Sequence, residues 1–303
     1  MSVAQLESVE IQLEAPSGLW SDAWRRLIRN PGAIVGFVLV ALFVLTAIFA
    51  PLIATHDPRD QVARSQLSEG CCPGPSADHW FGVDDLGRDQ FSRVVYGARY
   101  SLLIGVVAVS VGVSFGLVLG AFSGFFGGKT DTVIMRLMDI MLSIPGLLMA
   151  IGIAAMLGAG LFSVMIAIGV VNVPIFARLL RGSVLGQKQN DFVLAARAIG
   201  VPRRTILVSH ILPNAISPII VAATLALATA IIDAAGLGFL GLGPQDPSTP
   251  EWGTMLTNTV RYLQTAPHLA IIPGLAIVVS VLGFNLIGDG LREALDPKLR
   301  GRT

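Results

Sequence analysis

The feature that most constrains this chain is a run of 38 consecutive residues, 140–177, that contains no Asp, Glu, Lys or Arg. About 20 apolar residues suffice for one helix to cross the hydrocarbon core of a bilayer. The run therefore predicts two spans, and Gly158 and Gly160 mark the turn between them. Charged residues make up 14% of the chain, against roughly 25% in soluble domains, and the mean hydropathy is +0.71. We therefore predict a membrane protein.

Six apolar segments are predicted to span the membrane, so the expected fold is all-α and polytopic, with six transmembrane helices. The predicted spans are 33–53, 100–128, 133–157, 161–177, 211–232 and 269–288. The 33 glycines suit helix packing in lipid, where small residues let backbones approach closely. The first span follows a polar segment and lacks a small-residue cleavage site, so we expect it to stay in the mature chain.

The distribution of positive charge predicts the orientation. If the N-terminus is cytoplasmic, 15 of the 21 basic residues lie in cytoplasmic segments, as the positive-inside rule requires. The expected organisation is a cytoplasmic segment at 1–32, a first transmembrane helix at 33–53, an extracytoplasmic loop at 54–99, a transmembrane core at 100–290 with a cytoplasmic coupling segment at 178–210, and a cytoplasmic tail at 291–303. We therefore expect a multi-pass protein of the cell membrane with both termini in the cytoplasm.

Residues 191–213 form an island of charge and turn residues between two apolar runs. Phe192, Ala195, Ala196 and Ile199 lie at i, i+3, i+4 and i+7, which is the spacing of one helical stripe. Gly200 suits the C′ position that ends such a helix, and Pro202 suits the first turn of the next one. The pattern predicts a short surface helix, a break and a new spanning helix, which together would form a docking site for a partner.

No catalytic, nucleotide or metal site is expected. The segment 123–130 lacks the first glycine of a P-loop, and the G-x-G-x-x-G match at 236–241 follows a predicted spanning helix rather than a strand. The four histidines are scattered, with no pair at metal-ligand spacing. Cys71 and Cys72 are adjacent, and we interpret them as two small thiols in a loop, with a vicinal or intermolecular disulfide as the alternative.

Ionisable groups and prolines near membrane depth are candidates for function. Asp139 is predicted to pair with Arg136 at i and i+3 on one helix face, with a partner from a neighbouring chain as the alternative. Asp233 is the best candidate for a charge that faces a translocation path. Pro145, Pro174 and Pro218 interrupt three predicted spans and can create kinks, and Pro145 and Pro218 join Asp233 as candidate path residues.

The island resembles the hallmark of the ABC-importer permease family, in particular the C-type subunit of the dipeptide/oligopeptide (peptide/nickel) importers. The hallmark is matched at Ala195-Ala196, Gly200 and Leu212-Pro213. Two positions depart from it: Leu194 stands where Glu is usual, and His210 stands where Ile is usual. Further resemblance lies in four segments, 29–31 with 50–51, 81–99, 239–253 and 285–297.

The resemblance implies a first helix followed by the five-helix core of a type I ABC importer. It also implies three kinds of partner protein besides the lipid bilayer, and no nucleic acid: a second homologous permease subunit, two ATPase subunits or domains, and an extracytoplasmic substrate-binding protein. ATP and Mg would be bound by the ATPase partners, with no cofactor and no enzyme activity on this chain. The coupling residues carried over from the family are Asp191, Phe192, Ala195, Ala196, Arg197, Gly200, Val201, Leu212 and Pro213.

The expected function is therefore ATP-driven import of di- or oligopeptides. Glutathione, a nickel complex or another small solute remain alternatives with the same architecture. An ion-gradient-driven secondary carrier is the alternative from another class, although no charge lies near the middle of a predicted span. A membrane scaffold without transport would leave the two long external loops unexplained.

Overall fold

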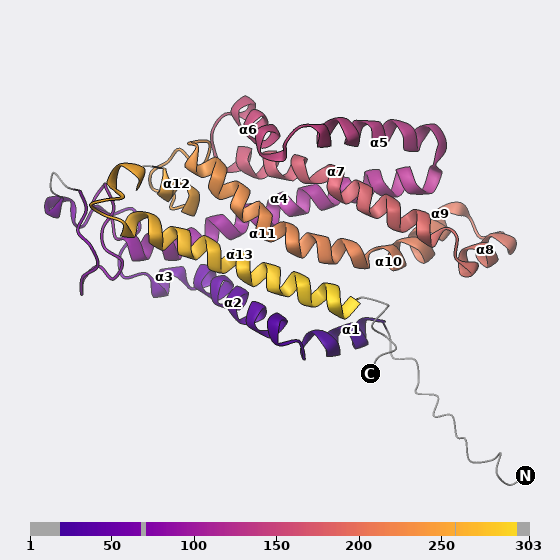
Figure 1. The fold of residues 1–303 in the computed structure, drawn as a ribbon, viewed down its shortest axis with the longest axis horizontal. Coiled ribbons are helices and arrows are strands. Elements are labelled where there is room, and N and C mark those ends of the chain that lie inside the picture. The colour runs from indigo at the N-terminus through magenta and orange to yellow at the C-terminus, as the bar shows by residue number, and fades with distance from the viewer. Residues whose placement is uncertain (1–18, 68–70, 258, 296–303) are drawn as a thin grey trace, which may run out of the picture.

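The computed structural model describes residues 19–67, 71–257 and 259–295, and within these ranges the fold is all-α. The described residues contain no strand, and an isolated β-bridge among them pairs Val83 with Asp89. The helices lie side by side in an elongated bundle (Figure 1). They are α1 (Leu19–Leu27), α2 (Pro31–Ile48), α3 (Ala50–Ile53), η2 (Arg64–Gln66), α4 (Gln90–Phe126), α5 (Gly128–Ser143), α6 (Gly146–Leu157), α7 (Leu161–Gln187), α8 (Asp191–Ala198), α9 (Arg203–Thr205), η3 (Ile206–Ile211), α10 (Leu212–Ala215), α11 (Ser217–Phe239), α12 (Trp252–Leu256), η4 (Thr259–Tyr262) and α13 (His268–Leu295).

Five helices of the described chain, α2, α4, α7, α11 and α13, are long and apolar enough to cross a membrane, and a bent pair, α5 and α6, makes a sixth span if it is counted as one. The predicted polytopic, all-α class is therefore confirmed. The third predicted span, 133–157, is not one straight helix, because α5 and α6 meet at 93°. The break contains Ile144 and Pro145, and Ile144 is extended at φ −92° and ψ 130°. Proline removes a backbone donor and pushes the residue before it out of the helical region, which accounts for the bend.

A row of glycines on α4 lets this helix pack closely against α7. A Cβ atom built on Gly112, Gly116, Gly120 or Gly124 would lie 2.7, 2.5, 2.5 and 3.0 Å from the nearest atom of α7, respectively. The four glycines repeat every four residues and so share one face of the helix. Because they carry no side chain, the two backbones approach as closely as small-residue helix pairs do in membranes.

The N-terminal helix α2 lies on the outside of the bundle against α13. Its start is fixed by Asn30, whose side-chain oxygen accepts a hydrogen bond from Ala33 N at 3.0 Å, and by Pro31 in its first turn. A Cβ on Gly36 would lie 2.8 Å from the carbonyl oxygen of Gly283, so the contact depends on this glycine. Ala33 and Gly36 are the buried residues of α2. One peripheral N-terminal helix therefore precedes the core.

Two helix boundaries differ from the sequence-based spans in ways that matter for function. α4 begins at Gln90, ten residues before the expected span, and its 37 residues are about 55 Å long at 1.5 Å per residue. Since the hydrocarbon core of a bilayer is about 30 Å thick, α4 extends beyond it. The predicted span 211–232 is divided between α10 and α11, and Pro218 lies in the first turn of α11 rather than within it.

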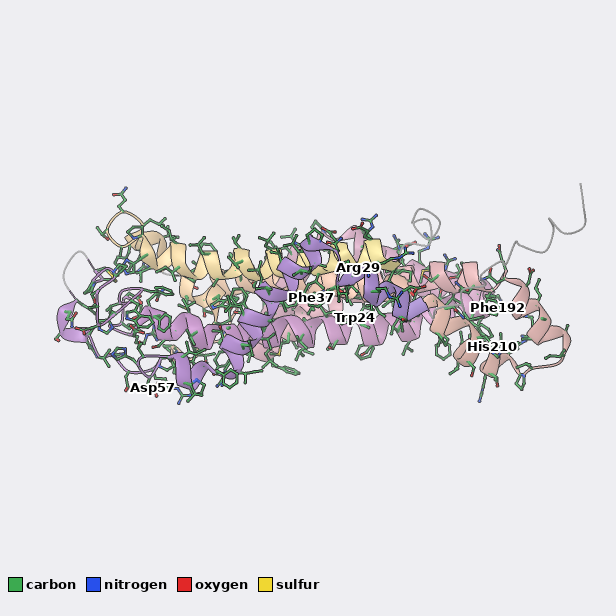
Figure 2. The ribbon with its side chains drawn as sticks, turned by 90° about the horizontal axis from the view of Figure 1, so that it is seen from below. Trp24, Arg29, Phe37, Asp57, Phe192 and His210 are labelled. Atoms are coloured by element: carbon green, nitrogen blue, oxygen red, sulfur yellow. A yellow bond between two sulfur atoms is a disulfide. The ribbon has the colours of Figure 1, made fainter. Side chains whose placement is uncertain are left out.

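The two ends of the bundle carry different elements, and we name them the α12 end and the α8 end (Figure 1). The α12 end holds α3, α12 and the long loops between α3 and α4 and between α11 and α13. The α8 end holds α8, α9 and the C-terminal part of α7, and it projects beyond α1 and the last turn of α13. Figure 2 shows the same offset, with Phe192 and His210 farther along the bundle than Trp24 and Arg29.

Candidate functional site

The predicted docking helix is α8, and Gly200 ends it. Gly200 has a φ of +80°, and its N–H donates to Arg197 O at 3.0 Å, while Val201 N–H donates to Ala196 O at 3.0 Å. This pair of bonds is the Schellman motif, which favours glycine because the left-handed backbone conformation crowds a Cβ. The position predicted for Gly200 is thus where the structure places it. Asp191 in the first turn and Arg197 in the last also suit the helix dipole.

Most of the large side chains exposed on α8 and its C-cap residue Ile199 are apolar, beside Asp191 and Arg197. Val193 and Ala196 are buried against the bundle, whereas the side chains of Phe192, Leu194 and Ile199 are exposed, Ile199 at 81%. Of the four residues in the predicted stripe, only Ala196 is buried, and the other three face away from this chain. An exposed apolar helix face of this kind is typical of a surface that a partner covers.

Lys188 holds the base of α8 against the end of α4. Its Nζ donates to the carbonyl oxygens of Gly124 and Phe125 at 3.1 and 2.9 Å, which have no partner within the helix because α4 ends there. Burial and the nearby Arg197 lower the pKa of Lys188. A cavity of about 500 Å³ lies beside it, lined also by Arg203, Val201 and Phe126. The loop after α7 is therefore tied to α4 rather than free to swing.

A second tie at the α8 end joins three helices through Asp131. Asp131, in the first turn of α5, accepts two hydrogen bonds from Arg181 of α7, at 2.5 and 2.6 Å, and a third from the Ser123 hydroxyl of α4. Bidentate arginine–carboxylate pairs fix geometry as well as charge. Sequence reasoning missed this site, because its three residues belong to different helices and share no local spacing.

The predicted pairing of Asp139 with Arg136 is wrong. Asp139 of α5 forms its ion pair with Arg178 of α7 instead. Arg178 lies across the α5–α7 contact, so the neighbouring helix supplies the guanidinium. The i, i+3 rule describes isolated helix faces, and here a tertiary contact replaces the local one.

The segment that follows α8 returns the chain to the bundle through an unusual helix. Pro202 directly precedes α9 with φ −57° and ψ 138°, and η3 (206–211) is a π-helix that leads into Leu212-Pro213 at the start of α10. Leu212 N–H donates to Leu207 O, five residues earlier. Pro213 has no N–H to donate, which suits the place where the hydrogen-bond pattern changes. The segment therefore runs from α9 to α11 as consecutive helical turns, interrupted at Ile216 between α10 and α11.

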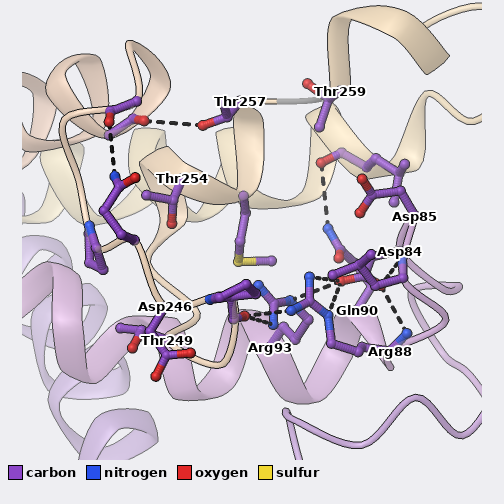
Figure 3. Close-up of a pocket in the computed structure, with 18 of the residues that line it drawn as sticks. Asp84, Asp85, Arg88, Gln90, Arg93, Asp246, Thr249, Thr254, Thr257 and Thr259 are labelled. Carbon is purple, nitrogen blue, oxygen red and sulfur yellow. Dashed lines mark hydrogen bonds and ion pairs between the residues drawn. The ribbon is translucent and has the colours of Figure 1, made fainter. Parts of the chain in front are cut away.

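The α12 end contains a buried charge network that joins two distant loops (Figure 3). Asp84 accepts hydrogen bonds from Arg88 Nε at 2.7 Å and Nη2 at 2.7 Å, and lies 3.2 Å from Arg93 Nε. Arg88 and Arg93 both donate to the carbonyl oxygen of Pro247, at 2.5 and 3.3 Å. The loop before α4 is therefore bound to the loop between α11 and α12.

Glu251 and Trp252 insert α12 between the spanning helices. The Glu251 carboxylate is 1% exposed and caps α12 by accepting from the N–H groups of Gly253 and Thr254, both at 2.8 Å. Burial raises the pKa of Glu251, although these hydrogen bonds oppose the shift. Trp252 is fully buried, its indole N–H donates to Val94 O at 3.0 Å, and a Cβ on Gly97 would lie 2.6 Å from its ring.

A cavity of about 320 Å³ lies beside this network and is lined by both loops. Asp85 faces it, and burial together with the neighbouring Asp84 raises the pKa of Asp85. None of the candidate path residues Asp233, Pro145 and Pro218 lines this cavity. Asp233 is half-buried on α11, Pro145 lies in the α5–α6 bend and Pro218 at the opposite end of α11. The structure does not bring the three together.

Two interpretations of the loop between α3 and α4 are corrected by the structure. Cys71 and Cys72 are joined in a vicinal disulfide, which was the alternative to two free thiols. The histidines are not all scattered, because His56 and His79 lie with their ring centroids 5.0 Å apart beside Asp89. The histidines meet because the loop folds back on the start of α4, which their spacing in the sequence does not record.

Comparison with known proteins gives consistent results along the chain. Residues 116–301 match the family described as binding-protein-dependent transport system inner membrane component, and residues 18–68 match the N-terminal TM domain of oligopeptide transport permease C. The chain is 49% identical over 281 residues to the dipeptide transport system permease protein DppC of Alkalihalophilus pseudofirmus, covering 93% of this chain and 90% of that protein. It is 48% identical over 282 residues to the glutathione transport system permease protein GsiD of Escherichia coli, covering 93% and 91%.

Among solved structures, the MetNI methionine ABC transporter in an inward-facing conformation has a similar fold. The match has a TM-score of 0.56 and 20% identity, and it covers 68% of this chain and 97% of that chain. A second crystal form of MetNI gives a TM-score of 0.53. With its all-α bundle, its peripheral first helix and these matches, the chain belongs to the family of binding-protein-dependent transport system inner membrane components, the permease subunits of ABC importers.

Proposed function

We propose that this chain moves short peptides into the cell as one of two permease subunits, with ATP hydrolysed on partner chains that bind α8. The observation that carries the proposal is the exposed apolar surface of α8, with Phe192 and Ile199 on one side of the helix and Leu194 on the other, while Val193 and Ala196 are buried. A surface of this kind needs a covering partner, and α8 stands clear of the ends of α1 and α13. The family resemblance implies that the partner bound at this position is an ATPase subunit.

The proposed orientation places the α8 end in the cytoplasm. Fifteen of the 21 basic residues belong to segments assigned to that side, which agrees with the positive-inside rule. The coupling segment at 178–210 holds six of them, Arg178, Arg181, Lys188, Arg197, Arg203 and Arg204. The α12 end and its two joined loops then face outward, toward the proposed substrate-binding protein.

The proposed mechanism transmits motion as displacement of a rigid element. The Schellman motif at Gly200, the buried side of α8 and the Lys188 contact with α4 leave little slack between α8 and the spanning helices. When the ATPases close on ATP, a shift of α8 moves α7 through the loop before it and α11 through η3 and α10. Rigid-body movement of packed helices is an established way to switch access, and a flexible linker would absorb it.

Leu194 changes the chemistry of the proposed contact at one position. The resemblance places Glu there, but in this chain the side chain is Leu and is 51% exposed. The contact with the ATPase at this point is then apolar rather than charged. Docking by the rest of the face does not depend on an ion pair at residue 194.

The proposed substrates are short peptides, because the relatives named above include a dipeptide permease and a glutathione permease. Both names denote small peptide-like molecules with charged ends. The cavity at the α12 end, with Asp85 on its wall, lies on the side from which such a substrate would arrive. A nickel complex remains the alternative cargo.

The proposal is tested by uptake into proteoliposomes that hold this chain, its partner permease and the ATPases, with the binding protein added outside. We expect uptake of a labelled dipeptide to require ATP hydrolysis and to stop with hydrolysis-deficient ATPases. Replacing both Phe192 and Ile199 by Ser is expected to abolish ATPase binding, whereas Val62→Ser, an exposed apolar residue of the other end, is expected to leave it unchanged. Uptake driven by an ion gradient without ATPases would overturn the proposal.

A further inference from the structure

Three segments of the chain meet at the α12 end around a histidine pair and a carboxylate. His56 follows α3, His79 belongs to the loop before α4, and Asp89 is the residue that caps α4. Their ligand atoms all lie within 4.8 Å of one another. His79 is 6% exposed and Asp89 is fully buried, while the His56 side chain remains 29% exposed. The cluster is therefore sheltered, with one side accessible to solvent.

The two oxygens of Asp89 have separate partners. Oδ2 accepts from Ser92 N at 2.8 Å, which caps α4, and from the Thr55 hydroxyl at 3.2 Å. Oδ1 faces the imidazoles, at 2.9 Å from His79 Nδ1 and 3.9 Å from His56 Nδ1. The helix cap thus orients the carboxylate and leaves one oxygen directed at both histidines. Orientation of this kind by surrounding hydrogen bonds is a feature of metal sites.

The backbone N–H groups of both histidines are also hydrogen-bonded. His56 N–H donates to Ser92 Oγ at 3.0 Å, and His79 N–H donates to Ser76 Oγ at 3.0 Å. His79 is hydrogen-bonded to Asp89 directly, whereas His56 Nδ1 lies 3.9 Å from the carboxylate and 3.0 Å from Thr55 Oγ1, whose hydroxyl in turn bonds to Asp89. Two imidazoles 5.0 Å apart would repel each other if both were protonated, whereas a shared cation would hold them together.

We propose that His56, His79 and Asp89 bind one divalent cation of the Zn²⁺ class, with water in the remaining position. Two imidazole nitrogens and one carboxylate oxygen suit Zn²⁺ and its transition-metal neighbours rather than Mg²⁺ or Ca²⁺, which prefer oxygen ligands. Zn–ligand bonds of about 2.0–2.2 Å place neighbouring ligands of a tetrahedron about 3.4 Å apart. The partly exposed His56 ring closes the small remaining gap by rotating toward Asp89.

The bound cation would connect the end of the N-terminal helix to the start of the core. His56 lies three residues beyond α3, and Asp89 directly precedes α4. Hydrogen bonds that already join these segments include Thr55–Asp89, His56–Ser92 and Arg93–Pro58. The site therefore acts as a clamp between the peripheral helix and the bundle, and its role is independent of the function proposed above.

The first test measures Zn²⁺ binding to the purified transporter carrying an affinity tag without histidine. We expect one tight site per chain by calorimetry, and tetrahedral absorption bands when Co²⁺ replaces Zn²⁺. Loss of a group that merely orients a ligand weakens metal binding roughly 10- to 100-fold, so His56→Ala and His79→Ala are each expected to weaken it by at least about 100-fold. His268→Ala, which removes an α12-end histidine outside the cluster, is the matched control. Equal Zn²⁺ affinity in all four proteins would overturn the proposal.

Two further measurements separate metal binding from folding. Asp89→Asn keeps a good helix-capping residue and removes the charged ligand, so we expect the metal-free thermal midpoint to change little while tight Zn²⁺ binding is lost. In the unmodified protein, Zn²⁺ is expected to protect His56 from carbethoxylation, read by peptide mass spectrometry. Tight binding retained in Asp89→Asn, or a His56 modification rate unaffected by Zn²⁺, would each contradict the proposed site.

Discussion

The two ends of this molecule treat polar and apolar groups in opposite ways. All five charged residues that are buried in the described part of the chain, Asp84, Arg88, Asp89, Arg93 and Glu251, belong to the α12 end. Each has hydrogen-bond partners within the chain, and the loops there are joined by them. The α8 end has ion pairs that are partly exposed, and exposed apolar side chains there include Leu194 and Ile199 at α8 and Phe126 at the end of α4.

This difference shows that the groups at the α12 end find their partners within this chain, whereas the apolar surface of α8 does not. A buried charge is tolerated only where partners satisfy it, so the α12 end must have its network formed to be stable. An exposed apolar face costs little in stability but favours association. Substitutions at the α12 end should therefore act on folding, and substitutions on the outer face of α8 should act on partner binding.

The largest effect is expected from Asp84→Ala, which leaves Arg88 and Arg93 buried without their carboxylate. Removing one partner of a buried ion pair costs about 3–5 kcal/mol in free energy of unfolding. SDS-driven unfolding of the purified chain in mixed micelles measures it. Asp60→Ala, in the same loop but exposed, serves as the control and should stay within about 0.5 kcal/mol. Similar values for both variants would contradict the contrast between the two ends.

An intermediate effect is expected at the three-helix tie of the α8 end. Arg181 and Asp131 are 33% and 21% exposed, so solvent weakens their attraction, and we expect a coupling energy of about 1 kcal/mol. A double-mutant cycle with Arg181→Met and Asp131→Ala measures this energy. Arg136→Met, on the exposed side of α5, should show no coupling to Asp131. A coupling as large as the Asp84 effect would remove the distinction drawn here.

Gly200 tests whether α8 must be held rigidly. A β-branched residue at φ +80° costs roughly 1–2 kcal/mol because its Cβ crowds the backbone, whereas Asn tolerates this conformation better. No atom lies within 4 Å of a Cβ at this position, so backbone strain is the only cost. We expect faster amide exchange in α8 and reduced ATP-dependent uptake in Gly200→Val, with Gly200→Asn closer to the unmodified protein. Normal coupling in Gly200→Val would show that the helix end need not be fixed.

The smallest effect on stability is expected from Leu194→Glu. Leu194 is exposed, so the free energy of unfolding should change by less than about 0.5 kcal/mol, and uptake should persist because the related family carries Glu there. Val193→Glu, one residue away but fully buried, places an unpaired charge in the core and should unfold α8. The pair is compared by thermal unfolding and by ATPase pull-down. Equal loss in both variants would show that the two sides of α8 are not distinct.

Much of this architecture follows from the sequence because its signals are local. Uncharged apolar runs locate the spanning helices, and Gly200 ends α8 where its position in the island predicts. The kink at Pro145 also follows from a single residue, although its 93° angle depends on how α6 packs on α7. Each of these features is set by residues close together in the chain.

The remaining features depend on contacts between distant residues, which periodicity does not record. Arg178 replaces Arg136 as the partner of Asp139, His56 meets His79 across a folded loop, and Arg88 reaches Pro247 over a sequence distance of 159 residues. The sequence pattern likewise does not show that the Phe192 side chain is exposed. A stripe of apolar residues has the same spacing whether it faces its own core or a partner.

The π-helix between α9 and α10 fixes the direction in which α8 faces. Its bonds run from residue i to i+5, so it holds one residue more than an α-helix closing the same turn. Each residue of an α-helix turns the chain by about 100° and advances it by 1.5 Å. Deleting a single residue from 206–211 would therefore let the segment close the same turn as an α-helix and leave the direction of α8 unchanged, whereas deleting one residue from the regular helix α11 would turn everything before it, α8 included, by about a quarter turn around the helix axis. The direction in which α8 faces is therefore set by the number of residues between it and α11.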